Sequence, residues 1–185
     1  MKNTRALRSH TLAKQLAFTA LFAALCFVST FVITVPLPNG YFNTGDVFVL
    51  LSGWFLGPLY GAAAAAVGSA LADVLSGFAF YAPATFFIKG IDAVLAWLVC
   101  KAMKPLLKKP SLDFICRGVS AIAAETFMVL GYFLFESALY TFAGGAAALL
   151  GNTLQGTLCS VCAVLISTLL YRVSAVKKLF PAFSE

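Results

Sequence analysis

Four ionisable side chains stand in an almost wholly apolar stretch between residues 45 and 92. They are Asp46, Asp73, Lys89 and Asp92, and the residues around them are mostly small or hydrophobic. A charged side chain in hydrocarbon costs at least ~2.5 to 3.5 kcal/mol, so it is kept where it faces protein or water, and usually where it has a function. These charges indicate a polar site buried inside a membrane protein.

More polar residues are expected at the same depth on later helices. Lys89 and Asp92 are three residues apart and therefore share a helix face, and Asn152 and Gln155 have the same spacing. Acidic residues lie at this level on two more helices, and tyrosine rings are available to stack on a heterocycle. Asn43 and Asp46 would close the cavity from above. The candidate substrate-binding residues are Asn43, Asp46, Asp73, Tyr81, Lys89, Asp92, Tyr132, Glu136, Asn152 and Gln155.

Two interpretations of this polar level are open. The charges could form internal salt bridges, Lys89 with Asp92 or with Asp73, that only fix helix packing. Buried ion pairs seldom repay their desolvation as stability alone. We therefore favour a pocket for a small polar molecule, and whether Lys89 touches that molecule or only pairs with Asp92 stays open.

Glu125 is expected deeper toward the cytoplasm than the other acidic residues. It is eleven residues, about three helical turns, from Glu136. The two could belong to a proton or ion path. We favour the alternative that Glu125 is solvated near the interface, or paired with Arg117 or a partner.

Residues for catalysis or metal binding are sparse. The one histidine, His10, lies in the N-terminal tail, which excludes catalysis by Ser/His/Asp or Cys/His arrangements and His-ligated zinc. The pair Cys159 and Cys162 has no second cysteine pair, and the five cysteines are expected as free thiols. No acidic DxxD motif marks a helix. We expect no enzymatic activity, no cofactor and no metal.

The elements that position these residues must be membrane helices. Of the 185 residues 61% are apolar and 11% are charged, and the mean hydropathy is +0.93. At ~20 residues per span this length suits six transmembrane helices in one all-α domain, 1–185. Gly57 and Pro58 turn the short second helix directly into the third. The expected helices, after a cytoplasmic tail at 1–12, are about 13–35, 46–56, 59–76, 83–103, 115–140 and 146–172.

The basic residues are placed by topology rather than spread over a surface. The formal charge is +6, and nearly all Lys and Arg residues fall before the first helix, between the fourth and fifth, or after the last. Six crossings put these three clusters on one side, as the positive-inside rule requires of cytoplasmic segments. Both termini are therefore expected in the cytoplasm.

Stripes of small residues mark two helices. Gly61, Ala65, Gly68 and Ala72 share a face of the third helix, and this stripe is expected to pack within the chain. The first helix carries alanines at the same spacing, and this face could meet another subunit. The candidate partner interface is Ala17, Ala20 and Ala24.

Several short motifs, taken in order, resemble a known family. They are AxxxA at 20–24, NTGD at 43–46, GPLYG at 57–61, GSALAD at 68–73 and YAPATFFIKG at 81–90. Together they are similar to the substrate-binding S component of energy-coupling factor (ECF) vitamin transporters, with the closest likeness to the hydroxymethylpyrimidine- and pyridoxine-type members.

The resemblance implies a fold, partners and a task. It implies six helices in the plasma membrane of a prokaryote, and a cavity in the outer halves of the later helices with the loop after the first helix as its lid. It implies high-affinity capture of a vitamin or precursor, and ATP-driven uptake with a transmembrane coupling subunit, which would meet Ala20 and Ala24, and two ATPase subunits. This chain has no GxxxxGK[ST] phosphate loop of its own.

The ligand and the transport mode have alternatives. Three acidic residues against Lys89 favour a pyrimidine or pyridine compound, such as hydroxymethylpyrimidine, pyridoxine or a thiamine-related molecule. Pantothenate, folate and riboflavin are the alternative ligands. A stand-alone proton-coupled carrier or channel, using Glu125 and Glu136 as a relay, is the alternative function.

Overall fold

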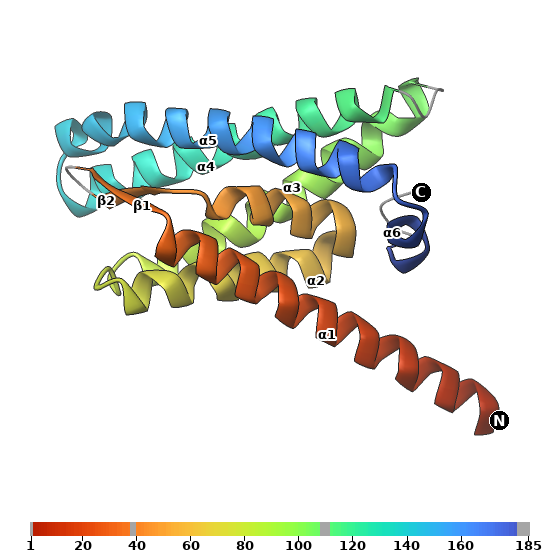
Figure 1. Ribbon diagram of the computed structural model, residues 1–185. Helices are drawn as coiled ribbons and strands as arrows, with labels where there is room; N and C mark the ends of the chain where they lie inside the picture. Colours follow the sequence, from red (N-terminus) through yellow and green to blue (C-terminus); the bar gives the residue numbers. More distant parts are fainter. Residues whose placement is uncertain (1, 38–39, 108–111, 181–185) are drawn as a thin grey trace.

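Long apolar runs fold into helices that lie side by side, with a small strand pair at one end (Figure 1). The computed structural model describes residues 2–37, 40–107 and 112–180. Its elements are α1 (Lys2–Val32), β1 (Thr34–Leu37), β2 (Gly40–Asn43), α2 (Gly45–Leu75), α3 (Ala82–Leu107), α4 (Asp113–Leu139), α5 (Phe142–Tyr171) and α6 (Ser174–Leu179).

The segment between α1 and α2 is a β-hairpin, where the sequence interpretation has only a loop. Strands β1 and β2 are antiparallel, with Thr34 opposite Asn43 and Leu37 opposite Gly40. Because β1 begins at Thr34, α1 ends at Val32 rather than at the expected residue 35. The helix also begins at Lys2, so residues 2–12 of the tail expected at 1–12 are helical.

Helix α2 reverses direction in its middle. Gly57 has φ 79° and ψ −175°, a left-handed φ that favours glycine, and Pro58 follows it. The Ser52 hydroxyl donates a hydrogen bond to the Gly61 carbonyl oxygen over 3.0 Å. In a straight helix residues nine apart are separated by about 13.5 Å. The two limbs of α2 therefore lie against each other, and the turn is at the Gly57–Pro58 position where the sequence places it.

The limbs of α2 lie at the centre of the fold. They pack against α1, α3 and α5, while α4 packs against α3 and α5. The approach is close because small residues face each other: a Cβ on Gly68 would stand 2.3 Å from the Ala23 carbonyl oxygen of α1, and one on Gly53 would stand 2.3 Å from that of Ala93 in α3. The small-residue stripe containing Gly68 thus packs within the chain, as expected.

The core combines alanines with a few large side chains. Leu50 and Met128 are completely buried. Trp54 is also buried, and its indole N–H donates to the Ser120 hydroxyl over 3.0 Å and to the Ala96 carbonyl oxygen over 3.2 Å. The polar edge of this ring is therefore satisfied inside an apolar core.

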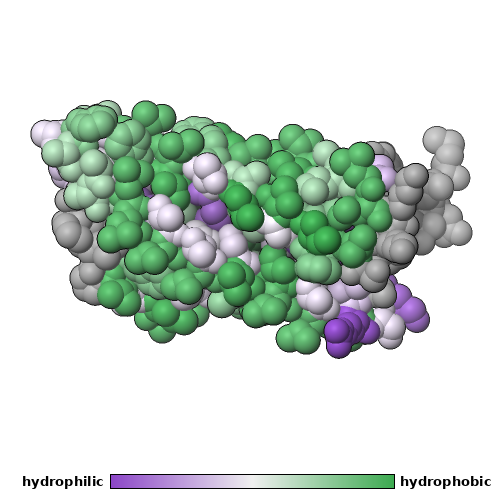
Figure 2. Space-filling view, turned by 90° about the horizontal axis from the view of Figure 1, so that it is seen from above, coloured by the Kyte–Doolittle hydropathy of each residue, from purple (hydrophilic) through white to green (hydrophobic). Residues whose placement is uncertain are grey.

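The outer surface is hydrophobic. Figure 2 shows mostly apolar atoms, with a limited polar strip on this face. Within the described residues, four helical segments are long and apolar enough to cross a membrane: Leu12–Val32, Asp46–Leu75, Asp113–Leu139 and Phe142–Tyr171. Exposed leucine, valine and phenylalanine side chains on these segments suit a lipid environment better than water.

Candidate functional site

A cavity lies beneath the β-hairpin, where the ends of several helices meet. It contains about 610 Å³ of empty space, including its opening to solvent. Strand β2, both flanks of the α2–α3 loop, α4 and α5 contribute side chains. The residues that line it are Tyr41, Asn43, Asp73, Phe78, Tyr81, Thr85, Tyr132, Glu136, Ala147, Ala148, Gly151, Asn152 and Gln155.

Aromatic rings form one side of this cavity. The ring centroids of Tyr41 and Phe78 are 5.0 Å apart, and those of Phe78 and Tyr81 are 6.1 Å apart. The Tyr132 hydroxyl shares a hydrogen bond of 2.9 Å with the Thr85 hydroxyl, which fixes that ring as well. Rings held in this way offer flat apolar faces to a planar ligand.

Three buried polar atoms of the lining have no hydrogen-bond partner among the described residues. They are one carboxylate oxygen of Asp73, one of Glu136 and the amide nitrogen of Asn152. Glu136 is 4% exposed and Asp73 is 6% exposed, so water has little access to these groups. A buried polar atom without a partner is costly. Two acceptors and one donor are therefore available to a molecule in the cavity.

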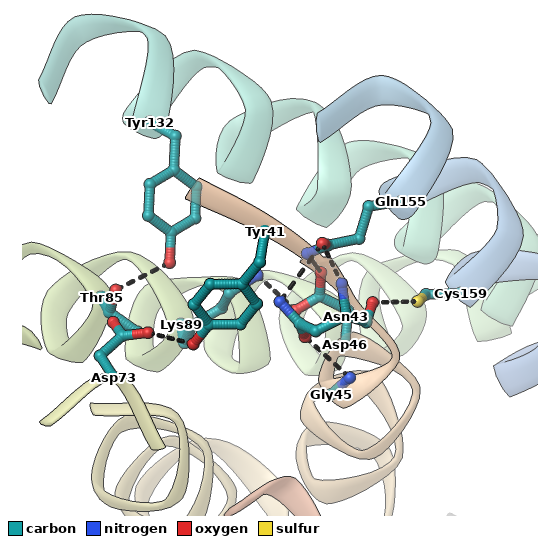
Figure 3. Close-up of polar contacts among 10 residues, drawn as sticks. All are labelled: Tyr41, Asn43, Gly45, Asp46, Asp73, Thr85, Lys89, Tyr132, Gln155 and Cys159. Atoms are coloured by element: carbon teal, nitrogen blue, oxygen red, sulfur yellow. Dashed lines mark hydrogen bonds and ion pairs between the residues drawn. The ribbon is translucent and has the colours of Figure 1, made fainter. Parts of the chain in front are cut away.

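The β-hairpin is fastened over the cavity by side-chain hydrogen bonds (Figure 3). The Tyr41 hydroxyl donates to a carboxylate oxygen of Asp73 over 2.5 Å, and the other Asp73 oxygen is the one left unpaired. Burial, and then the charge of Asp73, raise the pKa of the Tyr41 hydroxyl, so it keeps its proton and remains a donor. At the last residue of β2, the Asn43 backbone N–H donates to Gln155 Oε1 over 2.9 Å.

An ion pair lies below the cavity. Lys89 Nζ donates to Oδ1 of Asp46, and both side chains are almost fully buried. Gln155 Nε2 donates to the other oxygen of Asp46 over 2.6 Å. The ammonium group also lies 5.3 Å from the centroid of the Tyr132 ring, which lines the cavity. Gln155 and Tyr132 thus separate the ligand cavity from this charged layer.

Seven of the candidate residues line the cavity and three do not. The seven are Asn43, Asp73, Tyr81, Tyr132, Glu136, Asn152 and Gln155. Asp46 was expected to close the cavity from above, but the start of α2 is inside the bundle, so Asp46 is completely buried below. Lys89 turns toward it rather than toward Asp92 or Asp73. Asp92 is also completely buried and lies outside the described lining.

Glu125 differs most from its favoured interpretation. It is 4% exposed, so it is not solvated at an interface. Its carboxylate lies with those of Asp46 and Asp92, while the Arg117 guanidinium lies 5.5 Å from the Tyr171 ring centroid. Glu136 is in the last turn of α4, and Glu125 is eleven residues earlier, in the middle of this helix. Glu125 therefore lies deep in the bundle rather than at the helix end.

Some residues of the lining are missed by sequence reasoning. Phe78 and Thr85 lie in or next to the α2–α3 connection, where no periodic pattern assigns a face. Tyr41 lies in β2, and the signal in the sequence that could have found this strand is the dipeptide Asn39-Gly40, which is typical of hairpins.

The expected partner interface is open in this structure. Ala17, Ala20 and Ala24 are all exposed on α1. Figure 1 shows the first half of this helix extending away from the other helices.

Comparisons with known proteins agree with this architecture. Residues 11–172 match the model of the family described as "ECF-type riboflavin transporter, S component". The chain is also 32% identical over 131 residues to a Pyrococcus woesei protein described as "Uncharacterized protein in gap 3'region", and the match covers 69% of this chain and 82% of that protein. A cavity lined by several membrane helices and the family match over most of the chain lead to one conclusion: the chain belongs to the ECF-type riboflavin transporter S component family.

Proposed function

We propose that this chain captures a neutral or cationic pyrimidine or pyridine compound of the vitamin group in the cavity under the β-hairpin. As a family member it is a substrate-binding subunit of an ECF vitamin transporter and not an enzyme. The ligand is the finer step. The observation that carries it is the set of unpaired atoms on Asp73, Glu136 and Asn152, next to the aromatic rings of the lining.

The charges of the lining support this ligand class. The described lining contains two carboxylates and no Lys or Arg, since Lys89 is engaged by Asp46 below. An amino or hydroxyl group of a ligand would donate to Asp73 and Glu136, and a ring nitrogen would accept from Asn152. A carboxylate ligand such as pantothenate would instead meet two acids. Hydroxymethylpyrimidine, pyridoxine and thiamine-related compounds meet these requirements.

Riboflavin is the second candidate, because the matched family is described as a riboflavin transporter component. Its ring system also stacks on aromatic side chains and has both donors and acceptors. Because riboflavin is larger than a single-ring compound, it would need a longer cavity. Direct binding measurements therefore separate the two candidates.

The deciding experiment is calorimetric titration of the purified chain in detergent. The probes are hydroxymethylpyrimidine, pyridoxine, thiamine, riboflavin, pantothenate and folate. We expect the tightest binding from a pyrimidine or pyridine compound and none from pantothenate. Tightest binding of riboflavin would replace the first candidate by the second, and binding of none of the six would overturn vitamin capture in this cavity.

For the whole transport cycle we propose uptake driven by ATP in partner subunits. The family implies a coupling subunit and ATPases as partners. The exposed alanine face of α1 supports a contact with the coupling subunit, and the β-hairpin is the lid that admits the ligand. Vesicles containing only this chain should bind ligand without accumulating it. Accumulation driven by a proton gradient in such vesicles would show a stand-alone carrier instead.

We also propose a plasma-membrane topology with six helical passes and both ends in the cytoplasm. The start of α1 and α6 lie at the end of the molecule opposite the β-hairpin (Figure 1). Lys104 in the last turn of α3, and Arg172 after α5, lie toward that same end. Lys108 and Lys109, which belong to the expected cytoplasmic cluster, lie outside the described residues. Labelling of single cysteines introduced at Ser174 and at Phe42 should show opposite sides.

A further inference from the structure

Three carboxylates from three different helices converge below the ligand cavity. Asp46 is at the start of α2, Asp92 is in α3 and Glu125 is in α4. Each offers an oxygen, and these oxygens all lie within 4.8 Å of one another. None of the three belongs to the described lining of the vitamin cavity, so the cluster is separate from the proposed capture site.

Most of the oxygens in this cluster lack hydrogen-bond partners. Both oxygens of Asp92 and both oxygens of Glu125 are buried without a partner among the described residues. Asp92 is 0% exposed and Glu125 is 4% exposed, and Glu125 also borders a mostly apolar groove between α4 and α5. Asp46 differs, because Lys89 and Gln155 donate to its two oxygens. Four buried acceptor atoms of Asp92 and Glu125 therefore have no donor among the described residues, and one oxygen of each residue lies in the cluster.

The charge of the cluster points to a divalent ion. Three carboxylates (−3) and the Lys89 ammonium (+1) give a formal charge of −2. An uncompensated charge in the interior costs several kcal/mol per ion, so this excess must be neutralised. One divalent cation would balance it and would satisfy several oxygens at once.

The spacing suits a hard cation with oxygen ligands. Ca²⁺ binds carboxylate oxygens at about 2.3 to 2.6 Å, so two oxygens on opposite sides of the ion are about 4.6 to 5.2 Å apart. The separations of at most 4.8 Å lie within this limit. Room for the Glu125 carboxylate comes from Gly156 of α5, where an added Cβ would stand 3.1 Å from Glu125 Oε2.

We propose that Asp46, Asp92 and Glu125 bind a hard divalent cation in the bundle interior. Asp92 and Glu125 supply the free oxygens, and Asp46 completes the cluster while keeping its bond to Lys89. The ion would tie α2, α3 and α4 together directly beneath Gln155, which lines the vitamin cavity and donates to Asp46. Occupancy of this site does not depend on which vitamin the cavity takes.

The first test uses the unmodified chain purified in detergent. Its metal content is measured by mass spectrometry, and Ca²⁺, Mg²⁺ and Mn²⁺ are then added as chlorides to chelator-treated protein while thermal unfolding is followed. We expect close to one bound ion per chain. The midpoint should rise by ~5 °C for the best ion at 100 times its dissociation constant, and chelator should reverse the rise.

The second test uses variants that remove charge but keep shape. Asp92→Asn and Glu125→Gln should each abolish the rise in midpoint and the bound ion. Glu136→Gln is the matched control, because it changes the same kind of residue in α4 outside the cluster, and it should keep the full response to the ion.

Two results would overturn the proposal. One is the absence both of bound metal and of a midpoint shift with any of the three ions, which would mean that the excess charge is neutralised by protons. The other is a response that persists in both cluster variants, which would place the ion elsewhere. If a variant fails to fold, the metal content and chelator response of the unmodified chain still decide.

Discussion

The Asn43 backbone N–H donates a hydrogen bond to Oε1 of Gln155 over 2.9 Å, joining the β-hairpin to a helix 112 positions later in the chain. The amide nitrogen of the same Gln155 side chain donates to Asp46. One side chain therefore holds the cover of the cavity and the charged layer beneath it. If the hairpin opens, the bond to Asn43 breaks, and Oε1 of Gln155 becomes free to accept from a molecule in the cavity.

The hydrogen bond from the Tyr41 hydroxyl to Asp73 should control the rate at which ligand dissociates. Tyr41→Phe removes the hydroxyl that donates to Asp73 but keeps the ring in contact with Phe78. A hydrogen bond to a charged group contributes about 1.5 to 3 kcal/mol, so ligand dissociation should accelerate at least about 10-fold. Stopped-flow dissociation measures this, with Tyr60→Phe in α2 as the control. An unchanged rate would mean that Tyr41 does not restrain the hairpin.

The unpaired atoms of the lining should set ligand affinity. Glu136→Gln and Asn152→Ala each remove a group that we assign to the ligand, and each should weaken binding about 10-fold or more. Thr153→Ala changes the exposed neighbour of Asn152 and should leave affinity as it is. Calorimetric titration with the tightest-binding vitamin makes the comparison. Equal affinity in all three variants would mean that the ligand lies elsewhere.

The buried ion pair should respond strongly to loss of one partner. Lys89→Met leaves the Asp46 carboxylate buried without its counter-charge, and this should reduce the free energy of unfolding by about 3 to 5 kcal/mol. Adding Asp46→Asn to the same chain should restore part of the loss. Lys101→Met, at an exposed position of α3, is the control. Unfolding in detergent reports all three, and a double variant no better than Lys89→Met would contradict the pairing.

Close helix packing should make one glycine indispensable and another replaceable. Gly53→Ala would bring a methyl group to 2.3 Å from the Ala93 carbonyl oxygen, so α2 and α3 must separate, at a cost of about 1 to 3 kcal/mol. A Cβ on Gly118 of α4 meets nothing within 4 Å, so Gly118→Ala should be neutral or slightly stabilising. Comparing the unfolding midpoints of the two variants tests the interface directly.

The exposed alanines of α1 should matter for uptake rather than for binding. Ala20→Trp and Ala24→Trp place bulk where we expect the coupling subunit, so ligand affinity should stay the same while ATP-dependent uptake with the partners is lost. Gln15→Trp is also at an exposed position of α1 but lies on the side opposite the alanines, and it should retain uptake. Loss of ligand affinity in the alanine variants would instead assign this face to packing within the chain.

How much of this structure the sequence predicts depends on whether the signal is local. The long helices follow from apolar runs, and the reversal in α2 follows from Gly57 and Pro58, because each is written in consecutive residues. The β-hairpin is missed because two four-residue strands carry almost no periodic signal. The depth of the polar residues along each helix can also be predicted from the sequence, and seven of the candidates chosen in this way line the cavity.

Partners between helices are the part that the sequence does not show. The pairing of Lys89 with Asp46 depends on how the first limb of α2 is placed against α3, and 43 positions separate the two residues. In the sequence, Asp92 is three residues from Lys89 on the same helix, and Asp73 is expected at the same depth, so both are equally reasonable partners. The cluster of Asp46, Asp92 and Glu125 is hidden for the same reason: a search for acidic pairs on one helix cannot find three carboxylates from three helices.

The reversal of α2 at Gly57 also decides whether the chain runs along the bundle an odd or an even number of times. Five long helices that each ran straight through would carry the chain along the bundle an odd number of times and leave its first and last helices at opposite ends. Because α2 returns to the end from which it started, its contribution is even. The start of α1 and α6 consequently share one end of the molecule (Figure 1). The turn at one left-handed glycine therefore places the two terminal segments of the described chain at the same end of the bundle.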